Sequence, residues 1–263
     1  MMIRTKDPRR PEDLSAVSLS FRKMAWRFLG LFGARFLISK LYPKSTICFF
    51  DVEDSPGVKG TVAFTIDDAF CGEDNPGGTM LPEVLDLLRE YQARATFFVA
   101  GTHCDSASRE RIPDLLAAGH ELANHSREDR PYHKESKQDF LKDLNATAQT
   151  IREMGADPAP WYRAPHAKFS RTMQEVLAEK GLTHVMVDCF ANDTAIPDAA
   201  FIAQFVLSTL REGSIVLIHM PEKNMREWNL QAMRDTLEGI KARGFEVVTV
   251  SELVERSCSA EIC

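Results

Sequence analysis

The chain has 263 residues, which is enough for one large core and is a usual size for a barrel of alternating strands and helices. Its net charge of −6 is unevenly spread, because residues 1–44 carry ten Lys or Arg against three Asp or Glu and the rest carries 22 against 35. The acidic body argues against nucleic acid as a partner, since phosphates would be repelled.

The first 58 residues differ in character from the rest. We expect residues 1–58 to form an arm, an amphipathic helix and an accessory strand ahead of a barrel domain at 59–263. Apolar residues recur at helical spacing across 21–41, while Arg27 and Arg35 argue against a transmembrane span, and no cleavable signal peptide is visible. Two interpretations stay open: a helix packed over the bottom of the barrel, which we favour, or peripheral contact with a membrane surface. The compartment, secretory or membrane-peripheral, is also open.

The first strand of the expected barrel runs directly into two adjacent carboxylates, Asp67 and Asp68. The preceding residues from 61 alternate in size and include β-branched side chains, which is typical of a buried strand. Burial and mutual repulsion both oppose ionisation of such a pair, so a nearby cation or a catalytic task is expected. A turn opened by Asp, or a helix cap, is the alternative interpretation.

Strand-like and helix-like segments then alternate to the end of the chain. After the strand at 61–67, further strands are expected at 95–101, before 125, and at 158–165, 183–187, 214–219 and 245–250. The expected helices lie at 81–88, 112–118, 141–151, 173–177, 198–211 and 230–242. This alternation predicts an α/β fold with seven βα units and an N-terminal helical extension.

Polar residues follow several of these strands, and the C-terminal strand ends of a parallel barrel share one rim. The motifs are TIDD at 65–68, NHS at 124–126, RAP at 163–165, the segment at Asp193, and LIH at 217–219. In this order they resemble the five motifs of the polysaccharide deacetylases, carbohydrate esterase family 4 with the NodB-homology domain. The resemblance covers roughly residues 60–253. Within the family, the chain resembles the chitin deacetylases. It implies a distorted (β/α)7 barrel.

The resemblance also implies a reaction, the metal-dependent hydrolysis of N-acetyl groups from N-acetylglucosamine units of a glycan such as chitin or its oligomers. Amide hydrolysis needs an activated water, a base, oxyanion stabilisation and an acid, and a divalent metal supplies the first and third. Asp67 matches the family's general base, and Arg163 the arginine that orients it. His219 would be the general acid, with Asp193 holding it protonated, although Asp193 could instead turn its loop.

The metal ligands implied by the resemblance are Asp68, His125 and Asp129. The family's second motif normally supplies a second histidine where this chain has Asp129, so His133 is a competing candidate. Pro131 disfavours the helical geometry that would bring His133 back beside His125. Two carboxylates and one imidazole favour manganese, cobalt or ferrous iron more than the family pattern does, while zinc can still bind tightly.

The substrate-binding residues implied are Pro165, His166, Phe190 and Leu217, with Leu217 beside the acetyl methyl. His166 and Phe190 stand where the family pattern has an aromatic residue and an aspartate, which leaves the groove and the glycan open. Two alternatives remain: a related amide hydrolase, such as a deformylase or a cyclic amide hydrolase, and a catalytically silent carbohydrate-binding relative. We expect a glycan as the partner and a monomer.

Overall fold

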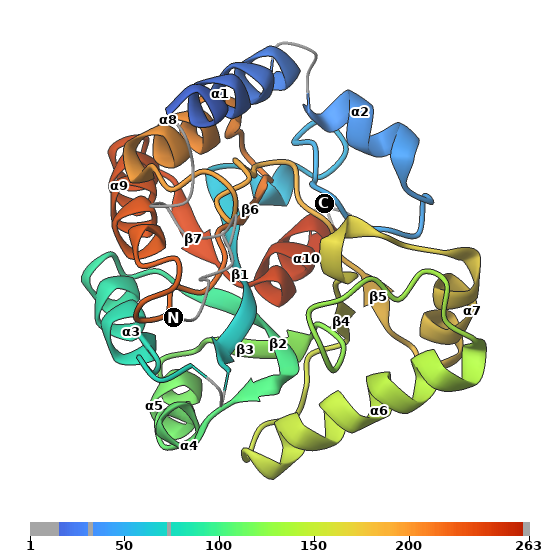
Figure 1. Ribbon diagram of the computed structural model, residues 1–263. Coiled ribbons are helices and arrows are strands. Elements are labelled where there is room, and N and C mark those ends of the chain that lie inside the picture. Colours follow the sequence, from blue (N-terminus) through green and yellow to red (C-terminus); the bar gives the residue numbers. More distant parts are fainter. Residues whose placement is uncertain (1–15, 31–33, 73–74, 260–263) are drawn as a thin grey trace.

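The computed structural model describes residues 16–30, 34–72 and 75–259, and these contain one parallel sheet of seven strands (Figure 1). The order is β5-β4-β3-β2-β1-β6, with β7 paired to β1. The strands are β1 (Thr61–Cys71), β2 (Ala95–Cys104), β3 (Glu121–Asn124), β4 (Trp161–Tyr162), β5 (Thr183–His184), β6 (Ile215–Leu217) and β7 (Glu246–Val248). The predicted α/β barrel with seven βα units is therefore confirmed, although β4, β5 and β6 are shorter than expected.

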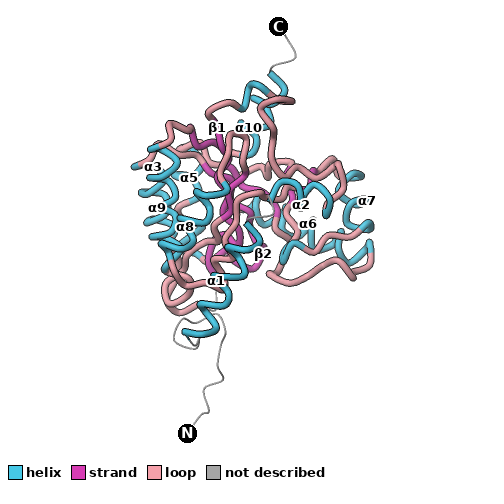
Figure 2. Tube along the Cα trace, turned by 90° about the horizontal axis from the view of Figure 1, so that it is seen from above, coloured by secondary structure: helices cyan, strands magenta, loops and turns pink. Residues whose placement is uncertain are grey.

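Helices surround the curled sheet, and several of them bury one apolar face against it. Figure 2 shows the strands between α3, α5, α8 and α9 on one side and α6 and α7 on the other. In α3, the buried Leu81, Val84, Leu85 and Leu88 follow the spacing of one helix face, as predicted. The helices of the barrel are α3 (Leu81–Glu90), α4 (Ser106–Arg109), α5 (Ile112–Ala117), α6 (Lys137–Glu153), α7 (Arg171–Glu179), α8 (Ala199–Thr209) and α9 (Trp228–Ala242).

The last strand departs from the order of a regular barrel. β7 pairs with residues 61–63 of β1, and the carbonyl of Val247 accepts a hydrogen bond from the Arg94 amide just before β2. β7 therefore lies at the N-terminal ends of β1 and β2. The chain then enters a helix that was not predicted, α10 (Val250–Cys258), whose Val250 and Leu253 are fully buried. In Figure 1, α10 lies inside the ring of outer helices, and it closes the bottom of the barrel.

The expected accessory strand at 47–50 is reduced to two isolated bridges. Ile47 pairs with Val185 just after β5, and Phe49 pairs with Ser214 just before β6. These bridges span the gap between the two edges of the sheet. The segment therefore helps to close the barrel without adding a strand to it. A short 3-10 turn, η2 (Pro56–Val58), then leads into β1.

The predicted helix at 21–41 is two helices, α1 (Ala16–Gly30) and α2 (Ala34–Leu41), while its residues 31–33 lie outside the described residues. Phe21 and Met24 lie on the apolar side of this predicted helix but are 65% and 61% exposed, so this part of the apolar side does not pack on the barrel. Instead Trp26 makes edge contacts with Phe190 and Phe205. The helix lies against α8 and the loop before it (Figure 1), at the side of the barrel and not over its bottom.

Within the described residues, no helix is long and apolar enough to cross a membrane. Arg35 of α2 forms an ion pair with the buried Asp188, with Nε 2.8 Å from Oδ2. Arg22 and Lys23 of α1 also bond inward, to the Ala195 carbonyl and the Asp198 carboxylate. These contacts attach α1 and α2 to the side of the barrel, while contact with a membrane surface stays a prediction.

Candidate active site

Both aspartates of β1 face one cavity because the pairing of β1 with β2 is irregular at this point, where β1 contains one extra residue. β1 advances from Ile66 to Ala69 while its partner β2 advances only from Phe97 to Val99. Asp68 adopts a φ of 57°, in the left-handed region. Neighbouring side chains of a regular strand point to opposite faces, so this irregularity lets Asp67 and Asp68 share a face. The predicted strand end at Asp67 is thus wrong, since β1 resumes pairing and continues to Cys71.

Asp67 is held by Arg163, which follows β4. The guanidinium Nη1 donates to Asp67 Oδ1 at 2.6 Å and to Thr65 Oγ1 at 2.8 Å, and both charged side chains are almost fully buried. Nε donates to the Val185 carbonyl at 3.0 Å. Burial lowers the pKa of Arg163, against the opposing effect of Asp67, but a guanidinium titrates so high that it stays charged. Asp67 Oδ1 is therefore fixed, and Oδ2 lies 3.8 Å from His125 Nε2.

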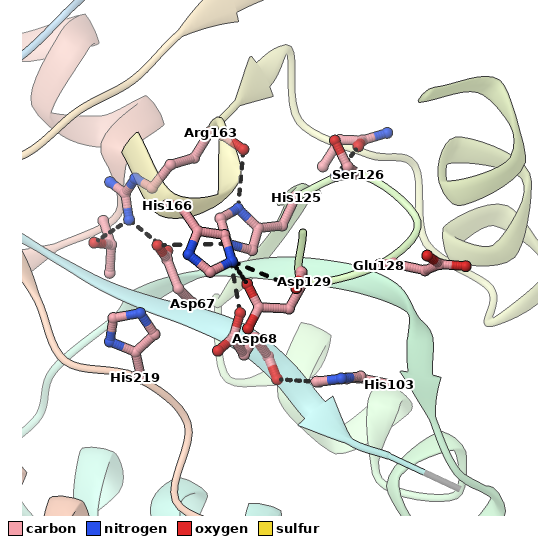
Figure 3. A network of polar contacts seen from close by, with 12 residues as sticks. Asp67, Asp68, His103, His125, Ser126, Glu128, Asp129, Arg163, His166 and His219 are labelled. Atoms are coloured by element: carbon pink, nitrogen blue, oxygen red, sulfur yellow. Dashed lines mark hydrogen bonds and ion pairs between the residues drawn. The ribbon is translucent and has the colours of Figure 1, made fainter. Parts of the chain in front are cut away.

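His125, directly after β3, is turned toward the same two carboxylates (Figure 3). Its Nδ1 donates to the Arg163 carbonyl at 2.9 Å, and its Nε2 lies 3.5 Å from Asp68 Oδ1. Burial, the largest effect, lowers the pKa of His125, but Asp67 and Asp68 together raise it above its ordinary value. The carbonyl fixes the ring so that Nε2 faces the carboxylates.

Asp68 and His125 fit a divalent metal. Asp68 Oδ1 is buried and has no hydrogen-bond partner among the described residues. A carboxylate oxygen beside an imidazole whose other nitrogen donates to a carbonyl is a donor arrangement that suits such an ion. Burial acts to raise the pKa of Asp68, but Arg226 and His125 hold it well below its usual range, so the ligand is anionic.

The predicted third ligand, Asp129, does not form a ligand group with Asp68 and His125. Asp129 lines the same cavity, but its Oδ1 lies 3.1 Å from Nε2 of His166. In consequence, the described part of the chain holds no group of three His, Cys, Asp or Glu side chains arranged to bind a metal ion. The competing candidate, His133, lines a neighbouring cavity and not the one that contains Asp68 and His125. Asp129 as a ligand stays a prediction.

His219 lies just beyond β6 and is paired with Asp193, as expected. Asp193 Oδ2 accepts from the His219 backbone amide at 2.7 Å, and Oδ1 accepts from Nδ1 at 2.9 Å. Asp193 is fully buried and also accepts from Asn229 Nδ2 at 2.7 Å. Burial, the largest effect, lowers the pKa of His219, but Asp193 outweighs it and the pKa is raised to about 9. The imidazole is therefore protonated at neutral pH.

One charged residue at the centre of the site was missed by the sequence analysis. Arg226, in the loop between β6 and α9, donates from Nη1 to Asp68 Oδ2 at 2.7 Å. Its Nη2 donates to Oε1 of Glu222, which is fully buried, at 3.3 Å. Burial acts to lower the pKa of Arg226, but Asp68 and Glu222 raise it above its ordinary value. Each of the two aspartates thus has its own arginine.

These residues line a cavity of about 1100 Å³ that also holds three of the four predicted substrate-binding residues, His166, Phe190 and Leu217. The fourth, Pro165, does not line it, because it is buried at the start of the short turn η3 (Pro165–Ala167). Arg22 of α1 does line it, a contribution that strand-end motifs could not reveal.

Known proteins resemble the chain over most of its length. The polysaccharide deacetylase family model matches residues 54–185. The chain is 27% identical over 192 residues to a chitooligosaccharide deacetylase of a Bradyrhizobium strain, covering 69% of this chain and 87% of that protein. It is 29% identical over 201 residues to a peptidoglycan-N-acetylglucosamine deacetylase of Bacillus cereus, covering 76% and 90%.

Among solved structures, a family 4 acetyl xylan esterase from Clostridium thermocellum in complex with a cobalt ion is similar, with a TM-score of 0.64 and 30% identity. The similarity covers 74% of this chain and 90% of that one. The matched residues include Asp67, Asp68, His125 and Arg163, which the structure brings to one cavity. The chain belongs to the polysaccharide deacetylase family.

Proposed function

We propose that the protein is a metal-dependent hydrolase that removes N-acetyl groups from N-acetylglucosamine units of a glycan such as chitin or chitin oligomers. The observation that carries this proposal is that three different pairs of side chains are directed toward one cavity. Asp67 has one oxygen fixed by Arg163 and one free. Asp68 Oδ1 lies 3.5 Å from His125 Nε2 and accepts no hydrogen bond from the described residues, and His219 is paired with Asp193.

The metal would be held by Asp68 and His125, with Asp129 as the predicted third ligand. When bound, a divalent metal ion acidifies water and neutralises charge that develops on the acetyl oxygen. The donor set of two carboxylates and one imidazole suits manganese, cobalt or ferrous iron as well as zinc. His125 can serve as a ligand because its Nδ1 proton is committed to the Arg163 carbonyl at 2.9 Å, which leaves Nε2 for the ion.

Asp67 is suited to be the general base. Arg163 holds Oδ1 at 2.6 Å, so Oδ2 is the oxygen left to accept a proton from water. The ion pair is buried, and its geometry is fixed further by the bond from Arg163 to Thr65 at 2.8 Å. Water adjacent to both Oδ2 and the metal ligands would then attack the acetyl carbon.

His219 is suited to be the general acid for the departing amine. Its pKa of about 9 keeps it protonated at neutral pH, and Asp193 fixes Nδ1, so Nε2 is the nitrogen that can donate to the sugar. Near it, Leu217 and Phe190 give the cavity an apolar wall suited to a methyl group.

The test is acetate release by the purified protein, stripped of metal and then supplied separately with Mn²⁺, Co²⁺, Fe²⁺ or Zn²⁺. The substrates are chitin oligomers, peptidoglycan fragments and acetylated xylan, together with formylated and cyclic amides. We expect metal-dependent acetate release from N-acetylated glycans. Formate or ring-opened products would support the amide hydrolase alternative. Glycan binding without metal binding and without turnover would support a catalytically silent carbohydrate-binding relative.

A further inference from the structure

The structural feature that the proposed reaction leaves unused is the buried ion-pair chain Asp68–Arg226–Glu222. Arg226 is 7% exposed, and Asp68 and Glu222 are 2% and 0% exposed. Its two terminal nitrogens divide between the carboxylates, with Nη1 2.7 Å from Asp68 and Nη2 3.3 Å from Glu222. A fork of this shape fixes two acceptors relative to each other, which a lysine cannot do.

Arg226 occupies one oxygen of Asp68 and leaves the other for the metal. Oδ2 accepts the guanidinium bond, whereas Oδ1 has no hydrogen-bond partner among the described residues and lies 3.5 Å from His125 Nε2. The two oxygens of Asp68 therefore serve two different cations. A guanidinium that competed with the metal would instead lie on Oδ1, between Asp68 and His125.

The charges of Asp68, Arg226 and Glu222 also support a role beside the metal site and not in competition with the metal. Glu222 neutralises Arg226, so the three groups together carry the single negative charge that Asp68 would carry alone. A divalent ion at Oδ1 then meets a site whose net charge is unchanged but whose carboxylate can no longer rotate. Arg226 thus supplies orientation without adding net repulsion.

Glu222 is itself fixed by the loop after β1. It pairs with Thr79 through the backbone, and its Oε2 accepts from Asn75 Nδ2 at 2.9 Å and from the Gly72 amide at 3.4 Å. Arg226 has a φ of 59°, a left-handed conformation that this loop-to-loop packing must hold in place. Such strain is expected where a side chain has to be aimed.

We propose that Arg226, anchored by Glu222, is a positioning residue that holds Asp68 so that only its Oδ1 faces the metal site. The inference rests on the proposed function only in requiring a divalent ion at Asp68 and His125. It concerns binding of the ion and needs no substrate.

The experiment measures Co²⁺ and Zn²⁺ affinity of the metal-stripped, full-length protein by competition with a chromophoric chelator, and the visible spectrum of the Co²⁺ form. Arg226→Met removes the fork, and Arg226→Lys keeps the charge but can reach only one carboxylate. The matched control is Arg234→Met, which removes another arginine near this loop, paired with Glu90 at 2.8 Å on the surface.

We expect Arg226→Met to lower metal affinity roughly 10- to 100-fold, as for other groups that orient a metal ligand, with a smaller loss in Arg226→Lys. The Co²⁺ bands should change in Arg226→Met, because Oδ2 becomes free to join Oδ1 on the ion. Arg234→Met should match the wild type in affinity and spectrum.

Equal or tighter binding by Arg226→Met would overturn the proposal and make Arg226 a bystander or a competitor of the metal. Reduced affinity with an unchanged Co²⁺ spectrum would also overturn it, leaving a role in folding alone. If Arg226→Met does not fold, Arg226→Lys decides, since wild-type affinity there would show that the fork is not needed. Wild-type protein that binds no divalent ion would instead refute the metal-dependent function.

Discussion

Two adjacent aspartates on one strand are each held at one oxygen by a different arginine, and each has its second oxygen left toward the cavity. Arg163 holds Oδ1 of Asp67 and leaves Oδ2, whereas Arg226 holds Oδ2 of Asp68 and leaves Oδ1. Both free oxygens lie within 4 Å of Nε2 of His125, at 3.8 and 3.5 Å. Each arginine therefore fixes the direction in which its aspartate presents the remaining oxygen, and both remaining oxygens are directed toward the same imidazole nitrogen.

The largest effect that separates the two aspartates should come from Asp67→Asn. The amide cannot take a proton from water, so turnover should fall by about 10²- to 10⁴-fold, while Asp68 and His125 still bind metal. Metal content and acetate release are measured on the same preparation. Near-wild-type turnover in the loaded variant would remove Asp67 from the role of base.

The buried ion pair between Arg163 and Asp67 can be tested by measuring the free energy of unfolding. Arg163→Met leaves Asp67 buried without its cation, and breaking such a pair costs about 3–5 kcal/mol in the free energy of unfolding. Urea denaturation measures the change. Arg89→Met is the control, since its pair with Asp86 is 66% and 71% exposed and should contribute under about 1 kcal/mol. Equal losses in the two variants would contradict the assigned burial.

His219 adds a pH-dependent test at the opposite side of the cavity. Its pKa rises from 6.5 to about 9, so the folded state binds this proton more tightly than the unfolded state. The resulting stability is complete below pH 6.5 and is lost as pH rises to about 9, a change on the order of 3 kcal/mol. Unfolding free energies at pH 6 and 9.5 for wild type and His219→Gln isolate the effect. Parallel pH profiles would argue against it.

The smallest effect concerns the third ligand. Asp129 is 38% exposed and faces His166, so Asp129→Ala should lower metal affinity by only roughly tenfold. His133→Ala should leave the affinity unchanged, because His133 lines the neighbouring cavity. Loss of metal in His133→Ala with retention in Asp129→Ala would reverse the assignment and place a second imidazole in the site.

The sequence predicted the half of the site that lies at strand ends. His125 and Arg163 directly follow β3 and β4, and His219 lies two residues past the end of β6. Parallel strands carry their C-terminal ends to one rim. Arg226 could not be found in this way, because it lies seven residues past His219 in a loop without periodicity. Its contact with Asp68 depends on how that loop packs against the loop after β1, which no local pattern encodes.

Other differences have local causes. The shared orientation of Asp67 and Asp68 depends on an irregularity at Asp68, which period-two alternation cannot represent. Phe21 is exposed because the opposite face of α1 packs inward. That face carries the bonds from Arg22 and Lys23 and the contact of Trp26 with Phe190. A readable signal was overlooked at α10, where Thr249 and Glu252 form a capping box that marks a helix start.

The placement of α1 and α2 bears on what counts as the smallest working unit of this enzyme. A boundary at residue 58 would remove Arg22 from the cavity wall and Trp26 from beside Phe190. It would also leave the carboxylate of Asp188 in the interior without Arg35. Transplanting the barrel alone into another protein would therefore carry over the predicted catalytic side chains but would change the wall of the cavity around them. The segment that precedes the barrel in sequence is structurally one of its walls.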